Sequence, residues 1–241
     1  MISNSVLEKL ARFDTPTICN VIELFEVRPN TEGYMDGRIS SRFPEMGPMV
    51  GFAATAAFRS GAVPEKGSYV ALEAQVEQFA KLAGPSVVVF QDLDDPPVGA
   101  TFGEVMCSTY KAFGSVGLIT SGGGRDLLQV QALGYPVFTG STICSHAYCQ
   151  TFDVGRPVRV GGLVVRTGDL LHGDANGVTN IPLELAPAVA DAAEEFVAAE
   201  NHVLEYVKGS GPKEVRQLAE CRAAMGEAIA ALKRRVSKKK V

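Results

Sequence analysis

Long apolar runs are absent from this 241-residue sequence, and no stretch approaches the roughly 20 apolar residues that a membrane-spanning helix needs. Residues 1–16 also lack the basic start, apolar run and small-residue cleavage site of a secretory signal. The five cysteines are odd in number and scattered along the chain, which argues against a disulfide framework and favours a reducing compartment. We therefore predict a soluble, cytoplasmic protein.

An excess of positive charge is absent as well. The formal net charge is −4, which gives no reason to expect a nucleic acid or an anionic membrane as a partner. Basic residues gather only at 233–240, where they fit a solvated helix end.

Several catalytic signatures are missing. The sequence contains no G-x-G-x-x-G, Walker A, G-x-S-x-G or H-E-x-x-H pattern, so it lacks the marks of dinucleotide binding, phosphoryl transfer, α/β-hydrolase chemistry and zinc proteolysis. A Schiff-base aldolase needs a desolvated lysine, typically on a strand, whereas the lysines here fall in predicted helices, loops or the tail.

The hydrophobic pattern alternates between strands and helices after an N-terminal helical segment at 4–26, in which Thr15 or Thr17 is the expected cap of a second helix. Residues 28–47 are predicted to form a long connection. The predicted strands are 49–58, 86–92, 116–120, 136–138, 156–160 and 163–165, and the later helices are 69–82, 103–113, 125–133 and two after residue 183 separated by a turn at 209–212. This alternation predicts one α/β domain over 1–241 with a parallel or mixed sheet.

The segment 99–126 has two glycine-rich turns, each before a predicted helix. Gly103 lies in the first turn, and glycines 122–124 form the second, so a ligand can approach the main chain closely at both. Free N–H groups at a helix N-terminus favour a carboxylate or a phosphate. Because ligands favour the carboxyl ends of strands in open α/β sheets, we expect an anion site here.

Glu104, Arg125 and Asp126 accompany these turns. A carboxylate can hold a hard divalent cation such as Mg²⁺, and an arginine can bind an anionic substrate through its planar fork. The alternative is structural: Asp126 caps the following helix and Arg125 forms a surface ion pair. The residue types alone leave both interpretations open.

Two histidine-containing segments are interpreted structurally. Structural zinc usually needs four ligands, and this segment would supply only three: Cys144, His146 and Cys149. We therefore expect buried thiols and a hydrogen-bonded histidine here. Residues 172–178, with their glycines and Asp/Asn pattern, predict a turn between two strands.

The order of several short motifs resembles the RraA-like family: G-E at 103–104, G-G-G-R-D at 122–126, L-G-Y-P-V-F at 133–138 and G-D-x-x-G-V-x-x-I-P at 173–182. The resemblance covers about residues 5–205 and leaves a C-terminal helical extension at 213–236. It implies a three-layer swivelling β/β/α domain with N- and C-terminal helices. The family includes 4-hydroxy-4-methyl-2-oxoglutarate aldolases and oxaloacetate decarboxylases. Members often carry a demethylmenaquinone methyltransferase label, which we disregard because no S-adenosylmethionine-binding glycine loop is present.

The resemblance implies roles for individual residues. Asp126 would be the direct protein ligand of Mg²⁺ or Mn²⁺, and Arg125 would bind the keto acid. The main chain of four consecutive residues would contact the substrate's pyruvoyl carboxylate: Gly103, Glu104, Val105 and Met106.

The resemblance also implies homotrimers or hexamers with sites at subunit interfaces. Glu104 would orient metal-bound water, and Glu200 or Glu195 from a neighbouring subunit would act in the same way. The family often has acidic residues where this chain has Ser121 and Asn20, so we expect a different substrate pocket.

The predicted activity is therefore a divalent-metal-dependent C–C lyase on small 2-keto acids. It would cleave 4-hydroxy-2-oxo-dicarboxylates by retro-aldol reaction, decarboxylate oxaloacetate, or both, through a pyruvate enolate. The alternatives are a non-catalytic regulator that binds a ribonuclease, as some RraA-type members do, and a related lyase or hydrolase with another substrate.

Overall fold

The computed structural model describes residues 2–65 and 72–237. The strands are β1 (Ser40–Ser41), β2 (Met49–Arg59), β3 (Ser86–Asp92), β4 (Ala100–Phe102), β5 (Ser115–Thr120), β6 (Gly123–Gly124), β7 (Val137–Thr139), β8 (Ser141–Thr142), β9 (Gln150–Phe152), β10 (Val158–Val160), β11 (Leu163–Val165), β12 (Leu170–Asp174) and β13 (Gly177–Ile181). The α-helices are α1 (Asn4–Leu10), α2 (Thr15–Leu24), α3 (Leu72–Val76), α4 (Glu104–Ala112), α5 (Leu127–Ala132), α6 (Ala186–Lys208) and α7 (Val215–Ser237).

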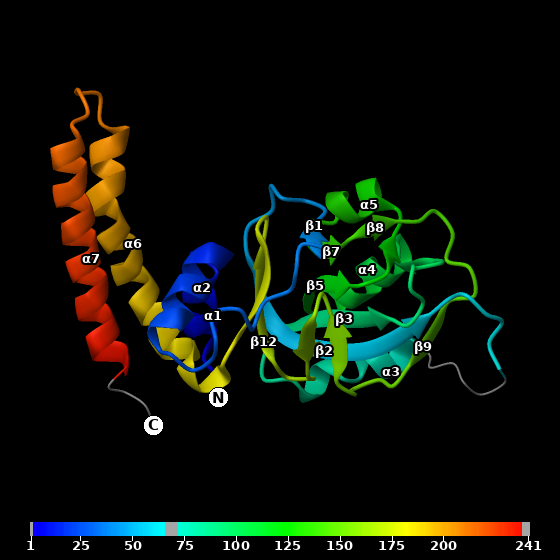
Figure 1. Cartoon of the computed structure of the whole chain (residues 1–241). Helices are drawn as coiled ribbons and strands as arrows, with labels where there is room; N and C mark the ends of the chain where they lie inside the picture. Colours follow the sequence, from blue (N-terminus) through cyan, green and yellow to red (C-terminus); the bar gives the residue numbers. More distant parts are fainter. Residues whose placement is uncertain (1, 66–71, 238–241) are drawn as a thin grey trace.

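An eight-stranded mixed sheet forms the centre of the molecule, in the order β1-β7-β5-β3-β2-β12-β13 with β9 also paired to β2 (Figure 1). Strands β2, β3, β5 and β7 are parallel, and β12 and β13 form an antiparallel hairpin beside them. A second, smaller parallel sheet is built from β4, β6 and β8.

Both faces of the large sheet are covered. Along β3, Val87 and Val89 pack into one apolar cluster, and Val88 and Phe90 pack into another, as the two-residue period of a strand requires. Strands β10 and β11 contribute to the first cluster, whereas α4 and α5 contribute to the second. The result is the three-layer β/β/α arrangement that the family resemblance implied.

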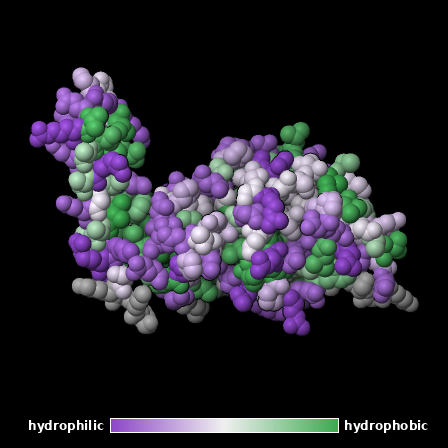
Figure 2. Space-filling view, viewed as in Figure 1, coloured by the Kyte–Doolittle hydropathy of each residue, from purple (hydrophilic) through white to green (hydrophobic). Residues whose placement is uncertain are grey.

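The two ends of the chain meet in a helical subdomain. α1 and α2 pack on α6, and α7 runs back along α6 to form a hairpin that projects away from the sheets (Figure 1). Apolar side chains are exposed on this hairpin, including Leu204, Val207 and Val215, and apolar surface is visible near its tip (Figure 2). Among the helices of the described residues, none combines the length and apolarity needed to cross a membrane.

Two sequence predictions need correction. The helix predicted over 69–82 lies partly outside the described residues, and its remainder is α3 followed by a 3₁₀ turn at Phe79–Lys81. The cap of α2 is Asp14, whose Oδ1 accepts a hydrogen bond from the Thr17 amide at 2.8 Å. The Thr15 hydroxyl cannot take this role because it bonds Nδ1 of buried His172, at 2.9 Å.

Candidate functional site

The pairing of β4 with β6 brings the two glycine-rich turns together. Phe102 and Gly124 are register partners at the carboxyl ends of these parallel strands, and the Arg125 amide donates to the Phe102 carbonyl at 3.1 Å. A Cβ on Gly124 would lie 2.2 Å from Cζ of Phe102, so the ring occupies the space that a side chain would need. Gly103 and the Arg125–Asp126 pair therefore leave the small sheet side by side.

Asp126 does not cap the helix that follows it. Its backbone is left-handed (φ 55°), and its side chain makes no capping bond to α5. Oδ2 instead accepts a hydrogen bond from the Glu104 amide at 3.0 Å, in the first turn of α4, and lies 3.8 Å from Nε of Arg125. A left-handed non-glycine residue is uncommon and favours Asp and Asn among side chains. The predicted cap on α5 is therefore wrong, because the carboxylate binds the first turn of α4 instead.

A pocket of about 250 Å³ opens at this junction. Its lining residues are Ala100, Phe102, Gly103, Val105, Met106, Arg125, Asp126, His146 and Cys149. The amides of Val105 and Met106 belong to the first turn of α4, where N–H groups have no partner within the helix. With the Arg125 guanidinium, they make one wall of the pocket attractive to an anion.

The Asp126 carboxylate has the donor chemistry for a hard cation. Within the described part of the chain, Oδ1 of Asp126 has no hydrogen-bond partner, and no group of three or more His, Cys, Asp or Glu side chains could hold a metal. Such a site fits Mg²⁺ or Mn²⁺, which bind through one or two carboxylates and retain several waters, and does not fit structural zinc.

The structure assembles part of the predicted constellation. Glu104 takes part through its amide, while its exposed carboxylate does not line the pocket. Glu200 and Glu195 lie on α6, in the helical subdomain, and Glu195 bonds Arg235 there (Figure 1). Burial raises the pKa of Glu200, and nearby Asp14 adds to this. A contribution of α6 to a neighbouring subunit's site remains a prediction.

The two departures from the family pattern lie outside this pocket. Asn20 is exposed on α2. The Ser121 hydroxyl accepts a hydrogen bond from the Asp92 amide at 2.9 Å. Ser121 also lines another cavity, of about 440 Å³, at the carboxyl ends of β3 and β5. Burial raises the pKa of Asp92 there to about 6.

Sequence reasoning missed the contribution of residues 143–149. The prediction of buried thiols is wrong for Cys144, which is exposed, and Cys149 is only half-buried. His146 is exposed at the pocket, and Cys149 lies beside it. The mixed Cys/His composition was the available signal, but only the pairing of β8 with β6 carries the segment to Arg125.

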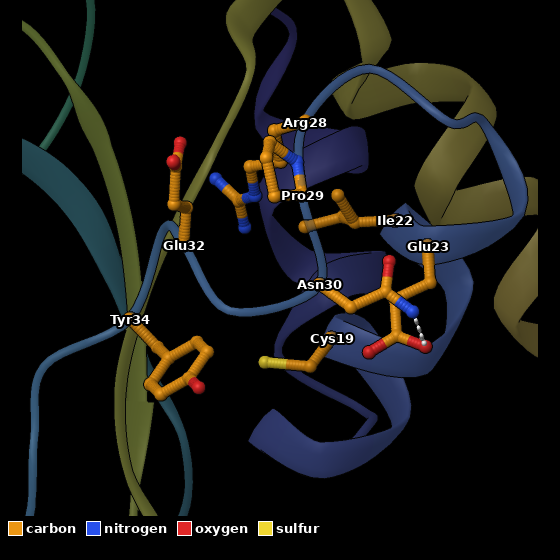
Figure 3. Close-up of a pocket in the computed structure, with 8 residues that line it drawn as sticks. All are labelled: Cys19, Ile22, Glu23, Arg28, Pro29, Asn30, Glu32 and Tyr34. Atoms are coloured by element: carbon orange, nitrogen blue, oxygen red, sulfur yellow. Dashed lines mark hydrogen bonds between the residues drawn. The ribbon is translucent and has the colours of Figure 1, made fainter.

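A third pocket lies between α2 and the 28–34 segment (Figure 3). It measures about 40 Å³, room for a few waters rather than a keto acid. Its arginine, Arg28, bonds the Asn180 side chain and carbonyl and the Thr179 hydroxyl. Arg28 thus attaches the long connection to β13. The side-chain amide of Asn30 attaches the same connection to α2, because it donates a hydrogen bond to the Glu23 carboxylate at 3.1 Å (Figure 3).

One curated relative carries an aldolase name. Over 101 residues the chain is 34% identical to a protein of Halalkalibacterium halodurans named "Putative 4-hydroxy-4-methyl-2-oxoglutarate aldolase", a match that covers 42% of this chain and 48% of the relative. The chain spans about half the length of the curated relatives it matches.

Solved structures share the fold. An uncharacterised protein from Pseudomonas syringae pv. tomato superposes with a TM-score of 0.72 at 21% identity, covering 92% of this chain and 94% of that one. Streptomyces coelicolor RraAS2, described as an unusual member of the RNase ES inhibitor RraA family, gives 0.68 at 22% identity, with 83% and 96% covered. The family model described as "RraA-like: Aldolase/RraA" matches residues 15–179. This chain therefore belongs to the RraA-like family.

Proposed function

We propose that this protein is a divalent-metal-dependent lyase that cleaves a C–C bond in small 2-keto acids and releases pyruvate. The observation that carries the proposal is the meeting of Asp126, Arg125 and the N-terminus of α4 in one pocket. The substrate would be a 4-hydroxy-2-oxo-dicarboxylate, oxaloacetate, or both. The aldolase name of the Halalkalibacterium relative points to the same chemistry.

Each pocket residue has a distinct role in the proposed reaction. The amides of Val105 and Met106 bind the substrate carboxylate, which is drawn by the helix N-terminus. Arg125 holds the keto acid and stabilises the negative charge that develops as an enolate forms, the kind of preorganised electrostatic term that dominates many reactions. Asp126 would hold Mg²⁺ or Mn²⁺, which would supply Lewis-acid polarisation of the keto oxygen. Gly103 leaves room for all of these groups, since a Cβ there would lie 2.5 Å from Oδ2 of Asp126.

We also propose that the protein acts as a homotrimer or hexamer. The exposed side chains of Leu204, Val207 and Val215 on the α6–α7 hairpin support this, because exposed apolar side chains that gather on one element can form an interface. In such an assembly Glu200 or Glu195 of one copy would approach the pocket of another.

The test is pyruvate release from oxaloacetate and from 4-hydroxy-2-oxo-dicarboxylates, with Mg²⁺, with Mn²⁺ and with a chelator. We expect turnover that needs the metal and falls by at least about 10²-fold in Asp126→Asn, which keeps the side-chain shape. Asp153→Asn is the matched control, because Asp153 is also left-handed (φ 46°) and is exposed.

Metal-independent turnover, or full activity in Asp126→Asn, would refute the proposal. A protein inactive on all these substrates that instead binds a ribonuclease stoichiometrically would support the regulatory role suggested by the RraAS2 description.

A further inference from the structure

Asp92 is a buried carboxyl group at the junction of the two sheets, and the roles given above do not use it. It ends β3, where its amide donates to the Ser121 hydroxyl at 2.9 Å and the Ser121 amide donates to the Phe90 carbonyl at 3.2 Å. Oδ1 of Asp92 accepts a hydrogen bond from the Asp94 amide at 3.0 Å. Oδ2 is buried as well, and no residue in the described part of the chain forms a hydrogen bond with it. A buried carboxyl oxygen without a partner requires an explanation, because leaving such an atom unpaired is costly.

Oδ2 of Asp92 lies against Gly122, the first residue of the glycine segment that precedes Arg125. A Cβ on Gly122 would lie 2.5 Å from this oxygen and 2.1 Å from Oγ1 of Thr101, so both oxygens occupy space that a side chain there would fill. Thr101 is the middle residue of β4, and both of its neighbours in the strand line the pocket. Thr101 itself is fully buried and does not line the pocket, as the alternation of side chains along a strand requires.

Hydrogen bonds lead from Thr101 to the main chain of Gly122. The Gly122 amide donates to the Thr120 hydroxyl at 2.9 Å, and the Thr120 hydroxyl donates to the Thr101 hydroxyl at 3.1 Å. The Gly122 carbonyl accepts from the Thr139 hydroxyl, so threonine side chains hold both polar groups of this residue. A hydroxyl group has one proton to donate, and that of Thr101 remains after it has accepted from Thr120. Oδ2 of Asp92 is an acceptor on the same face of Gly122.

We propose that Asp92 is a positioning residue for the lyase reaction, an inference that rests on the proposed function. In its ionised form, Oδ2 accepts the Thr101 proton and completes a chain of hydrogen bonds that all run in one direction from the Gly122 amide. Hydrogen bonds in such a chain polarise and strengthen one another. The chain holds the segment that leads into Arg125 and Asp126, whose distances determine the chemistry of the pocket. A protonated Asp92 would donate to the Thr101 hydroxyl instead, and the chain would no longer run in one direction.

The surroundings of Asp92 allow it to change its charge near neutral pH. Burial raises the pKa of Asp92 to about 6; the hydrogen bond from the Asp94 amide opposes this, and the negative charge of Asp94 adds to it. Asp92 lines the cavity of about 440 Å³, through which protons reach it from solvent. The other charged residues that line this cavity are Arg38, Asp94, Asp95 and Arg159.

The experiment measures pyruvate release from pH 5 to pH 8, with saturating Mg²⁺ or Mn²⁺, in wild type, Asp92→Asn, Thr101→Val and the double variant. Asparagine keeps an acceptor for the Asp94 amide but cannot ionise, and valine keeps the shape of threonine without its hydroxyl. We expect kcat/KM at pH 8 to fall by about 10- to 100-fold in each single variant, because a small misplacement of reacting groups is costly. The double variant should show no further loss, since both changes break the same chain.

The pH dependence separates positioning from packing. The ratio of wild-type activity to Asp92→Asn activity should approach 1 at pH 5, because Asp92 is then protonated in the wild type as well. Asp95→Asn is the matched control, since it removes an exposed carboxylate from the same cavity, and it should retain wild-type activity at both ends of the range.

A second measurement does not depend on turnover. The pKa of Asp92 is raised from 3.8 to about 6, so the stability contributed by the neutral carboxyl is complete below pH 3.8 and is lost as the pH rises through about 6. The Tm of Asp92→Asn minus that of wild type should therefore increase between about pH 4 and pH 6 and stay constant above. The same melting curves show that each variant is folded.

A loss of activity in Asp92→Asn that is equal at pH 5 and pH 8 would overturn the assignment, because it would indicate packing alone. Losses that multiply in the double variant, or a Tm difference that does not change with pH, would overturn it as well. These results leave the metal-dependent turnover of the wild type intact. A wild-type protein without turnover would instead refute the proposed function itself.

Discussion

Replacing Gly103 with alanine tests the geometry of the site with a single added methyl group. Gly103 has an extended backbone (φ −153°), which any residue can adopt, so the substitution introduces no backbone strain. The new Cβ would lie 2.5 Å from Oδ2 of Asp126 and 3.0 Å from Nε of Arg125. Ordinary van der Waals contact begins near 3.4 Å, so the carboxylate must move by roughly 1 Å.

A displacement of that size has different consequences for activity and for stability. Misplacing a reacting group by about 1 Å can cost about 10²-fold in rate, so we expect kcat/KM for pyruvate release to fall by that factor. The free energy of unfolding should fall by only about 1 kcal/mol, because the neighbours that must move are side-chain ends and alanine is a poorer helix cap than glycine. The assays are steady-state kinetics and urea unfolding on the same preparation.

Gly47→Ala is the control for added side-chain bulk, since nothing lies within 4 Å of the Cβ position there and Gly47 is not in a left-handed conformation. Wild-type activity in Gly103→Ala would refute the inference that the position of the Asp126 carboxylate limits the reaction. A loss of several kcal/mol in stability would show that the glycine serves packing instead.

Three further changes test the fold. Gly124→Ala should lower the free energy of unfolding by about 1–3 kcal/mol, because the new Cβ would overlap the buried Phe102 ring; Gly37→Ala, in open space, should not. Asp14→Ala should cost about 1 kcal/mol through loss of the α2 cap, measured by urea unfolding. Burial lowers the pKa of His172 below its ordinary value of 6.5, so the unfolded chain takes up a proton more readily than the folded protein does. The stability contributed by the neutral ring is therefore complete above pH 6.5. It declines as the pH falls from 6.5 towards the pKa of His172 in the folded state. The stability advantage of wild type over His172→Gln should therefore shrink by at most about 1.4 kcal/mol per pH unit below 6.5; an advantage independent of pH would contradict this.

The sequence by itself determined the longer helices and the long strands of the large sheet, whereas β1, β4, β6, β8 and β9 were not predicted. The β-branched run of β3 and the helical spacing of α1 and α2 are local patterns, and the structure confirms them. The glycines at 103 and 122–124 also marked a place where the main chain can be approached closely, although Gly123 and Gly124 form β6 and not a turn. The predicted cap of α2 was wrong because a distant residue binds the expected capping group. The Thr15 hydroxyl bonds His172 on β12, and the Asp14 side chain caps the helix instead.

Only the tertiary structure decided which residues share the pocket. The parallel pairing of β4, β6 and β8 joins segments near residues 103, 125 and 146. The sequence between these strands does not predict that they pair. The direction of the Asp126 side chain likewise follows from its left-handed backbone and from the hydrogen bond that it accepts from the Glu104 amide of α4. Sequence spacing identifies candidate groups, whereas strand pairing sets their distances, and chemistry depends on those distances.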